Sequence, residues 1–518
     1  MRARICAVLT AATIAIPFAA ITSPPASAAT TWQLTVRVID RTGQVAASAD
    51  VQVLNVGRDT GIDLGTGRHR QLRPGTYNVA AWIITGTGAG QTFTLADQVV
   101  DLTANKTVVL DARQGHRVRL SLNNPAAQAE TLEIAPIVGG HWAFNPTTIS
   151  PPPGAAYLVP MRSALMQLYV YSVWEKKGNT VAQPSPFRYD VVHVYRGLIP
   201  RSPAISTTTS SLTRVDVRVR ATDAGQTATL SLSPQPSNGP VPLNATSALG
   251  ATPAHLVSYR SPGWQWQPIV EWDSPAGTLR DNDLNQPAYG RGAHAELWGA
   301  AVWAPAPGAL FAGIDGRRLQ AGLVESDFPI GDPLHPSDEG SLASKEIRLY
   351  SGGTLLAHTG QYQVNVRIPE VSRQYRLTLT ARRPAGALLS ASISGVWKFM
   401  AKGSGSDFGT PAQVYGVQLL PAGLDGHDQV ASGSLTRVAL RIYSALTSSP
   451  VRLATVRAWA SANDGTSWRA VSVSWSGGRY VVSVKNASAA GFTSLRIHVG
   501  DRQGNSEDLT VIHAYGVR

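Results

Sequence analysis

Cysteine is almost absent from this chain: among its 518 residues, only Cys6 carries a thiol. Cys6 lies in an N-terminal stretch that has the features of a signal peptide, so we expect no cysteine in the mature protein. This excludes disulfide bridges, a thiolate nucleophile and a zinc site built from cysteine. We therefore expect packed apolar cores alone to stabilise the fold.

Long apolar runs are also lacking beyond the N-terminus. Arg2 and Arg4 precede an apolar segment at residues 5–21, and small residues at 26–28 form a cleavage site, so residues 1–28 are predicted to be a Sec-type signal peptide. No later stretch approaches the roughly 20 apolar residues that span a bilayer. The sequence predicts a secreted, extracellular protein without membrane insertion.

Acidic residues are fewer than basic ones, 33 against 45, which gives a formal net charge of +12. The basic residues are mostly arginine, and they stand singly on alternating positions instead of in clusters. This spacing favours solvated strand faces over a nucleic-acid patch. We expect no nucleic-acid partner, and we consider a polysaccharide, the cell wall or another secreted protein as partners.

The periodicity of an amphipathic helix is missing as well, and alternation of apolar and polar residues takes its place. One face of each such segment is expected to be buried and the other solvated, which is typical of strands. The sequence predicts an all-β fold of β-sandwich modules in tandem. The alternation is seen at Leu34, Val36 and Val38, at Val215, Val217 and Val219, and at Leu495, Ile497 and Val499.

Proline-rich breaks and changes in strand pattern divide the chain into four expected modules after the signal peptide. Residues 72–79 contain a Pro-Gly turn followed by a strand whose Tyr77 is expected to pack inward. This pattern resembles the carboxypeptidase regulatory-like, transthyretin-like sandwich. The expected modules are that sandwich at 30–114, a second β-sandwich at 115–200, a large β module with a tryptophan cluster at 201–400, and a fibronectin- or immunoglobulin-like sandwich at 401–518.

Six short strand and turn motifs follow one another along the chain: 298–305, 347–350 with Gly353, 375–377, 396–399, the Asp464–Gly465 turn ending in Trp468, and 501–505 with 514–516. In this order they resemble the C-terminal accessory region of actinobacterial secreted subtilisin-like (S8 family) serine proteases. The catalytic domain of that family is absent. The resemblance therefore implies a non-catalytic protein for extracellular binding or scaffolding.

Residues 462–468 allow two interpretations. Gly465-Thr466-Ser467 resembles the segment around the nucleophilic serine of subtilisin-like proteases. However, Trp468 stands where that motif continues into a helix, and the family's Gly-His-Gly-Thr-His motif has no counterpart. Asp-Gly is typical of a two-residue hairpin turn, so we expect a hairpin here and no catalytic residue.

A tryptophan concentration in the 201–400 module gives the candidate ligand-binding residues. Exposed rings of Trp264, Trp266 and Trp272 would form a platform for pyranose rings, with Asp281 and Asp283 beside them. The alternative is that these tryptophans fill a sandwich core. A secreted hydrolase, such as a glycosidase or peptidase-related enzyme, with an unrecognised site in this module is the other function considered; nearby carboxylates are Glu271, Asp273 and Glu296.

Cofactor motifs are lacking. The spacing of Asp281, Asp283 and Asn285 resembles the start of an EF-hand loop, but Gln286 stands where glycine is required and Gly292 where the bidentate glutamate belongs. We expect no cofactor, with calcium in another loop geometry left open.

Overall fold

The computed structural model describes residues 30–46, 49–58, 60–139, 149–221, 223–235, 243–274, 277–282, 288–305, 310–323, 330–331, 335, 337–338, 342–403, 410–444 and 453–518. The predicted signal peptide lies outside these ranges. Within them the chain forms strands and three single-turn 3-10 helices, η1 (Gly88–Gly90), η2 (Ala112–Gln114) and η3 (Thr209–Ser211), and no α-helix. The predicted all-β fold of tandem sandwiches is confirmed.

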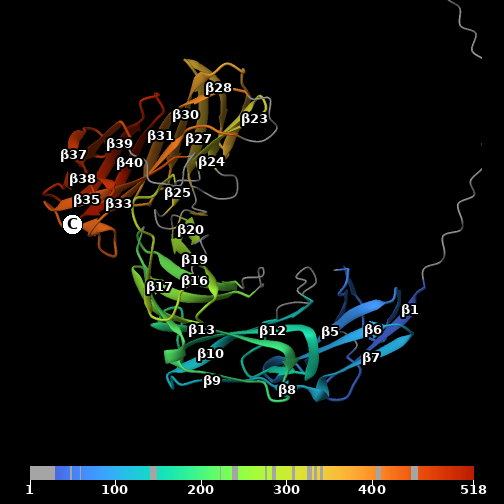
Figure 1. Ribbon diagram of the computed structural model, residues 1–518. Coiled ribbons are helices and arrows are strands. Elements are labelled where there is room, and N and C mark those ends of the chain that lie inside the picture. Colours follow the sequence, from blue (N-terminus) through green and yellow to red (C-terminus); the bar gives the residue numbers. More distant parts are fainter. Residues whose placement is uncertain are drawn as a thin grey trace, which may run out of the picture.

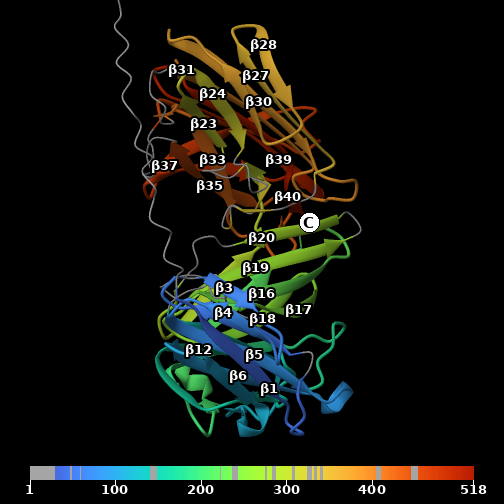
Figure 2. The same cartoon turned by 90° about the vertical axis from the view of Figure 1, so that its right-hand side faces the viewer.

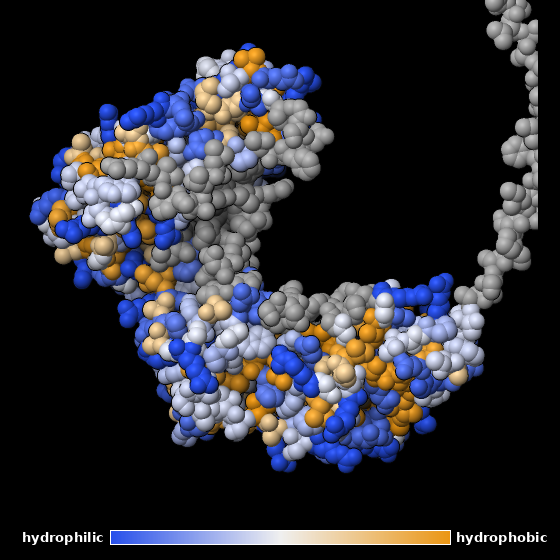
Figure 3. Space-filling view, in the orientation of Figure 1, coloured by the Kyte–Doolittle hydropathy of each residue, from blue (hydrophilic) through white to orange (hydrophobic). Residues whose placement is uncertain are grey.

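The chain builds two lobes, with the N-terminal half in the lower lobe and the C-terminal half in the upper lobe of Figure 1. The space-filling view shows a wide recess between the lobes on one side (Figure 3). In the view turned by 90°, β19 (Gln265–Ser274) and β20 (Gly277–Asn282) lie on the side of the lower lobe that faces the upper lobe (Figure 2).

The N-terminal sandwich packs a three-stranded sheet against a six-stranded sheet. Tyr77 follows the Pro-Gly turn and is buried in the core between them, as expected, with its hydroxyl donating to the carbonyl of Arg73. In order, the sheets are β4 (His69–Leu72), β1 (Trp32–Ile39), β7 (Lys106–Asp111); and β3 (Thr60–Asp63), β2 (Asp50–Asn55), β5 (Gly75–Thr85), β6 (Thr92–Leu102), β11 (Ala156–Leu158), β8 (His116–Arg117).

The remainder of the lower lobe consists of two further sheets and a short ribbon. The central sheet is β10 (Ala127–Val138), β12 (Met161–Lys176), β13 (Phe187–Ile199), β18 (Ala254–Arg260), β15 (Thr213–Val219), β21 (Ala293–Trp298). The facing sheet is β17 (Ala245–Ala251), β16 (Thr227–Gln235), β19, β20, β26 (Ser337–Asp338), and the ribbon is β14 (Ala204–Thr207) with β9 (Arg119–Leu122).

Strands β10 and β12 of the central sheet are buried on both faces. Leu168 and Val170 pack into one core together with Trp82 and Leu95 of the N-terminal sandwich. Tyr169 and Tyr171, on the opposite face, pack into the core that the facing sheet covers. A strand covered on both sides needs a continuous apolar run instead of alternation, and residues 168–171 provide one.

The second of these cores also contains ion pairs. Arg188 and Asp190 on β13 are fully buried, with Arg188 Nη2 2.8 Å from Asp190 Oδ1. Arg188 also reaches the facing sheet, where its Nη1 donates to the carbonyl of Leu230 and its Nη2 to the carbonyl of Ala245, at 2.9 and 2.8 Å. One guanidinium therefore links the two sheets of this sandwich.

The upper lobe contains a four-stranded sheet and one long folded sheet of twelve strands. In order, they are β29 (Gln363–Arg367), β24 (Arg318–Leu323), β23 (Leu310–Asp315), β32 (Thr410–Pro411); and β28 (Thr354–Thr359), β27 (Ser344–Ser351), β30 (Arg373–Arg382), β31 (Ser392–Ala401), β40 (Ser506–Val517), β39 (Gly491–Gly500), β36 (Thr455–Ser461), β37 (Arg469–Ser476), β38 (Arg479–Lys485), β35 (Leu435–Ser444), β33 (Tyr415–Pro421), with β34 (Gln429–Val430) beside β40.

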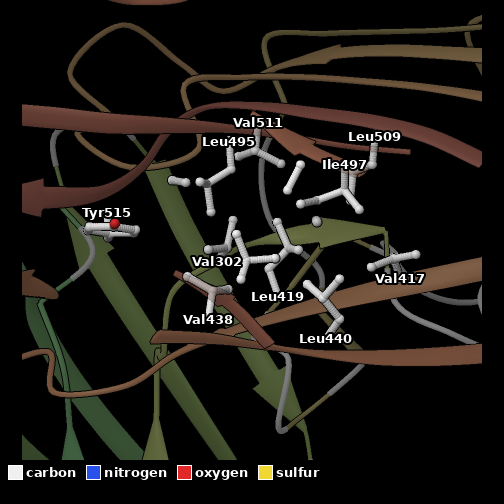
Figure 4. Close-up of a cluster of buried hydrophobic side chains, with 14 of the residues drawn as sticks. Val302, Val417, Leu419, Val438, Leu440, Leu495, Ile497, Leu509, Val511 and Tyr515 are labelled. Atoms are coloured by element: carbon white, nitrogen blue, oxygen red, sulfur yellow. The ribbon is translucent and has the colours of Figure 1, made fainter. Parts of the chain in front are cut away.

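Strand β37 makes the corner that folds the long sheet over itself. Residues 469–471 of β37 pair with β36, and residues 472–476 pair with β38. The C-terminal core lies between the two layers, where Leu495 and Val511 face Val438 and Leu440 (Figure 4). Such a strand, shared by both layers, closes a sandwich at one edge.

Among the described residues, both apolar packing and ion pairs join the lobes. Val302 lies between β21 and the short ribbon of β22 (Ala304–Pro305) and β25 (Ile330–Gly331), and it packs into the C-terminal core (Figure 4). The neighbouring Trp303 packs into a core of the lower lobe. Asp223 and Arg383 form a buried ion pair of 2.7 Å across the junction. Arg220 of the lower lobe also pairs with the buried Asp428.

These sheets divide the chain at other places than the expected boundaries. The central sheet contains strands from both sides of residue 200, because β13 pairs with β18. The expected 201–400 module is split near residue 300, since its second half forms strands of the upper lobe, and β31 pairs with β40 across the boundary at 400. The central sheet crosses a boundary because its strands β10 and β12 are buried on both faces and are shared between two cores. In the upper lobe, one face of β31 contributes Ile393 to one core and Trp397 to another.

The buried guanidinium gives a first prediction. Arg188→Ala leaves the Asp190 carboxylate buried without its cationic partner, so we expect the lower lobe to lose about 3–5 kcal/mol of unfolding free energy. Tryptophan fluorescence during denaturant unfolding measures this. The control is Arg218→Ala on the same sheet, where the Arg218 side chain is 68% exposed and its pair with Asp216 contributes at most about 1 kcal/mol. Equal effects of the two substitutions would contradict the assignment.

A buried carboxyl gives a second prediction. Asp97 on β6 is 1% exposed, and neither of its oxygens has a hydrogen-bond partner in the described part of the chain. Burial raises the pKa of Asp97 to about 7. The folded state therefore keeps a proton that the unfolded chain releases near pH 4, so the group lowers stability progressively as the pH rises from about 4 to about 7.

Asp97→Asn replaces this carboxyl with a neutral side chain of similar shape. We expect little change in Tm at pH 4 and a gain that grows with pH, to about 3 °C or more at pH 7.5. Asp101→Asn on the same strand is the control, because Asp101 is exposed. A gain that does not depend on pH would show that Asp97 is ionised in the folded protein.

Candidate functional site

A pocket of about 610 Å³ opens where the sandwich of the central and facing sheets ends. Its floor is formed by the cross-strand partners Gln167 and Arg196 on β12 and β13. Its opposite wall is formed by Gln235 and Gln265, which are partners on β16 and β19. The pocket exists because β12 and β13 run on beyond the apolar core while the facing strands end there.

Trp264 forms one side of this pocket and is half-buried. It follows a short turn that carries the chain from β18 in the central sheet to β19 in the facing sheet. Gly263 in that turn has a φ of +78°, a conformation that glycine adopts without strain. The Trp264 ring lies edge-on to Tyr169, with 6.0 Å between centroids, and the Tyr169 hydroxyl donates to Gln167 Oε1 at 2.8 Å.

The polar groups around Trp264 are mainly neutral at pH 7. Three glutamine amides line the pocket, and burial lowers the pKa of His193, so its imidazole is uncharged at this pH. Arg196 is the one cation in the lining, and it forms no ion pair with a described residue. No carboxylate belongs to the described lining.

The other two predicted tryptophans do not form a platform. Trp266 and Trp272 are 1% and 0% exposed, and both belong to the core below the pocket. Their indole nitrogens donate to the carbonyls of Ser261 and Arg220. The prediction of a face of three exposed rings is therefore wrong for these two residues, because alternate residues of β19 point into the sandwich. Trp264 alone borders open space.

The predicted acidic residues are placed in different surroundings. Asp283 lies outside the described residues, and so does the side chain of Asp281, whose backbone belongs to β20. Glu296 is buried and bound bidentately by Arg260, at 2.7 and 2.8 Å. Burial alone would raise the pKa of Glu296, but the charge and hydrogen bonds of Arg260 hold it below its usual value.

Where the structure describes side chains, no three of His, Asp or Glu gather as they would around a metal ion. The predicted Asp281–Asn285 calcium motif does not fall within that part of the chain.

The 462–468 segment is the tip of a hairpin. β36 and β37 pair antiparallel up to Ala460 and Arg469, and Asp464 and Gly465 have φ of +55° and +81°. The predicted hairpin is thus confirmed, but its connection is longer than two residues. Ser467 Oγ bonds to the Asn463 side chain within the loop, which is a structural role.

Sequence reasoning did not find the glutamines of the pocket. Gln167, Gln235 and Gln265 lie far apart in the chain, and only strand pairing brings them to one end of the sandwich. The Pro-Gly-Trp turn at residues 262–264 was the one local signal, because a tryptophan directly after a turn stands at the end of a strand instead of within it.

Among the described residues, no helix is long and apolar enough to cross a membrane. No protein-family model matches the chain, and no curated protein matches it. Similar solved structures include a streptococcal ancillary pilin (9% identity, 52% of this chain and 98% of that chain, TM-score 0.12), an I-band fragment of titin (10%, 59% and 97%, 0.14) and the human desmocollin-1 ectodomain (9%, 93% and 97%, 0.13). At these TM-scores, the similarities carry no conclusion about function.

Proposed function

We propose that this chain is a non-enzymatic extracellular binding protein that holds a neutral saccharide in the Trp264 pocket. The observation that carries the proposal is one half-buried indole surrounded by planar polar side chains. Gln167, Gln235 and Gln265 approach the same space as the ring, from two different sheets. This is the composition of a saccharide site, with one apolar surface for stacking and several bidentate partners for hydroxyl groups.

The chemistry of each group supports this ligand class. The indole face is apolar and electron-rich, so it attracts the weakly positive C–H groups of a pyranose ring. Each amide offers both an acceptor and donors, and Arg196 offers donors only, which suits the paired hydroxyls of a sugar. The neutral His193 adds a further donor or acceptor.

The dimensions of the pocket agree with a short saccharide segment. A volume of about 610 Å³ falls within the usual range of small-molecule sites, about 300–1,000 Å³. The pocket lies at the open end of a sandwich, so a longer polymer can leave it without crossing the core. Attachment to a polysaccharide or to the cell wall is therefore the role we favour.

Binding is favoured over hydrolysis by the residues around the pocket. Glycoside hydrolysis uses two carboxyl groups on opposite sides of the scissile bond. The described lining contains none, and Glu296 is occupied by Arg260. Among the described residues that line the pocket, no pair of carboxyl groups supports the hydrolase function considered from the sequence.

Trp264→Ala tests the proposal. Removing the stacking surface is expected to weaken saccharide binding at least tenfold, because a central aromatic residue commonly provides about 2 kcal/mol or more. Affinity electrophoresis of the mature protein through gels containing xylan, soluble cellulose derivatives, β-1,3-glucan or galactomannan measures the change. Gln235→Ala is expected to have a smaller effect in the same direction.

The control is Trp32→Ala in β1, a half-buried tryptophan of the N-terminal sandwich. It is expected to leave retardation unchanged. The proposal fails if none of these neutral polysaccharides retards the wild-type protein, or if retardation survives Trp264→Ala while circular dichroism shows both proteins folded.

A further inference from the structure

A second surface of unusual composition covers the C-terminal sandwich. It is the outer face of the sheet formed by β33, β35, β38 and the second half of β37, which we term the basic face. Figure 1 shows these strands on the flank of the upper lobe opposite β23 and β24. Their inner residues, including Val438, Leu440 and Val482, fill the C-terminal core, so the alternate residues point outward.

The basic face carries cations and no acids. Arg437 and Arg441 of β35 are exposed, as are Arg479 and Lys485 of β38. Strand register places Arg437 beside Ser483 and Lys485 beside Leu435, so all four cations share one face. The four strands contain no Asp or Glu residue. Lys485 donates to the carbonyl of Gly433, and none of these cations forms an ion pair with a described residue.

Small polar residues separate the cations. Ser472 and Ser474 of β37 are exposed and pair with Ser483 and Val481 on β38. The face is therefore shallow and rich in hydroxyl groups. Neighbouring strands lie about 4.8 Å apart, and residues four positions apart on one strand are about 13 Å apart, so the cations form two groups along the face.

An aromatic pocket lies at the edge of this sheet, where strand register places Trp475 and Tyr480 on the inner side with Leu440. It has a volume of about 360 Å³, and its lining includes Arg441, Arg479, Trp475 and Tyr480. Trp475 is 43% exposed and meets Tyr480 edge-on, with 4.7 Å between ring centroids. Gly477 and Gly478 form the hairpin that turns β37 into β38 and bring no side chain over the rings.

We propose that the basic face binds an acidic polysaccharide, with the anionic groups of the polymer on Arg437, Arg441, Arg479 and Lys485. Charge complementarity is the main reason. Exposed cations on strands that contain no acidic residue produce a positive potential that attracts a polyanion. Guanidinium groups also bind carboxylate or sulfate oxygens in bidentate geometry.

A polysaccharide fits this face better than a nucleic acid does. Sequence readout of duplex DNA requires an element that enters a groove, whereas the described residues of this face form a sheet without a projecting helix or ribbon. Single-stranded nucleic acid is bound by stacking successive bases on several aromatic rings. The described face offers a row of serine hydroxyls, which match the hydroxyl groups of a sugar chain, and no series of exposed rings, because Trp475 lies on the side of the sheet that carries Leu440.

The test uses polygalacturonate as the acidic polymer and its fully methyl-esterified form as the uncharged counterpart. We expect the mature protein to bind the acid form in low salt. Its affinity should fall at least tenfold when the salt concentration is raised to 0.5 M, because salt screens exposed charges. The uncharged ester should not bind. Arg441→Glu/Arg479→Glu should reduce binding to the acid form more than tenfold.

Arg37→Glu/Arg119→Glu is the matched control, because it changes the net charge equally at exposed positions of the lower lobe. It should retain binding. If both double variants lost the same affinity for polygalacturonate, net charge alone would explain the loss and the proposal would be overturned. Absence of binding by the wild type would also overturn it. Tighter binding of single-stranded DNA of equal charge would assign the face to nucleic acid instead. Trp264→Ala should leave polygalacturonate binding intact, so failure here is separable from failure of the neutral saccharide site.

Discussion

A guanidinium in the interior of the lower lobe sets the separation of the two sheets that frame the Trp264 pocket. Arg188 is fully buried, and an isolated charge in such a place is strongly unfavourable. Asp190 compensates the charge, while the carbonyl oxygens of Leu230 and Ala245 in the facing sheet and the hydroxyls of Ser247 and Tyr171 accept from the remaining donors. Since those carbonyls belong to β16 and β17, the ion pair is satisfied only when both sheets are in register. The geometry that aligns Gln167 with Gln235 at the pocket thus follows from a polar requirement in the core.

At the junction of the lobes, too, a buried ion pair is satisfied in only one arrangement of the elements that carry it. Asp223 and Arg383 are 4% and 6% exposed, and each would be an uncompensated buried charge without the other. A buried pair of this kind contributes little net stability compared with apolar packing, but it rejects arrangements in which the partners are separated. Apolar packing comes from the adjoining segment, where Val302 and Trp303 enter the cores of different lobes. The two lobes are therefore joined by both a packed segment and a charge pair that only one docking satisfies.

The sequence predicts the fold class and many strands well, because alternation at positions such as Val215 and Val217 depends only on local burial. It predicts module boundaries poorly, since β10 and β12 are covered on both faces and their pairing with distant strands is not encoded locally. For the candidate site, the pattern identified Trp264 but also Trp266, and only the strand ends show which of them borders the solvent. The resemblance to protease accessory regions stays a prediction.

The two proposed binding sites differ in the interaction that contributes most to ligand binding. The Trp264 pocket uses stacking and neutral hydrogen bonds, which salt affects little, whereas the basic face around Arg441 uses charge, which salt screens within about 10 Å. When one polymer reaches both sites, the protein binds it bivalently. The second contact then forms at a high effective concentration. A heteropolymer with neutral and acidic segments would therefore be held more firmly than either segment alone. Retention should then decline in two steps as salt rises, because the charged contact is lost before the stacked one.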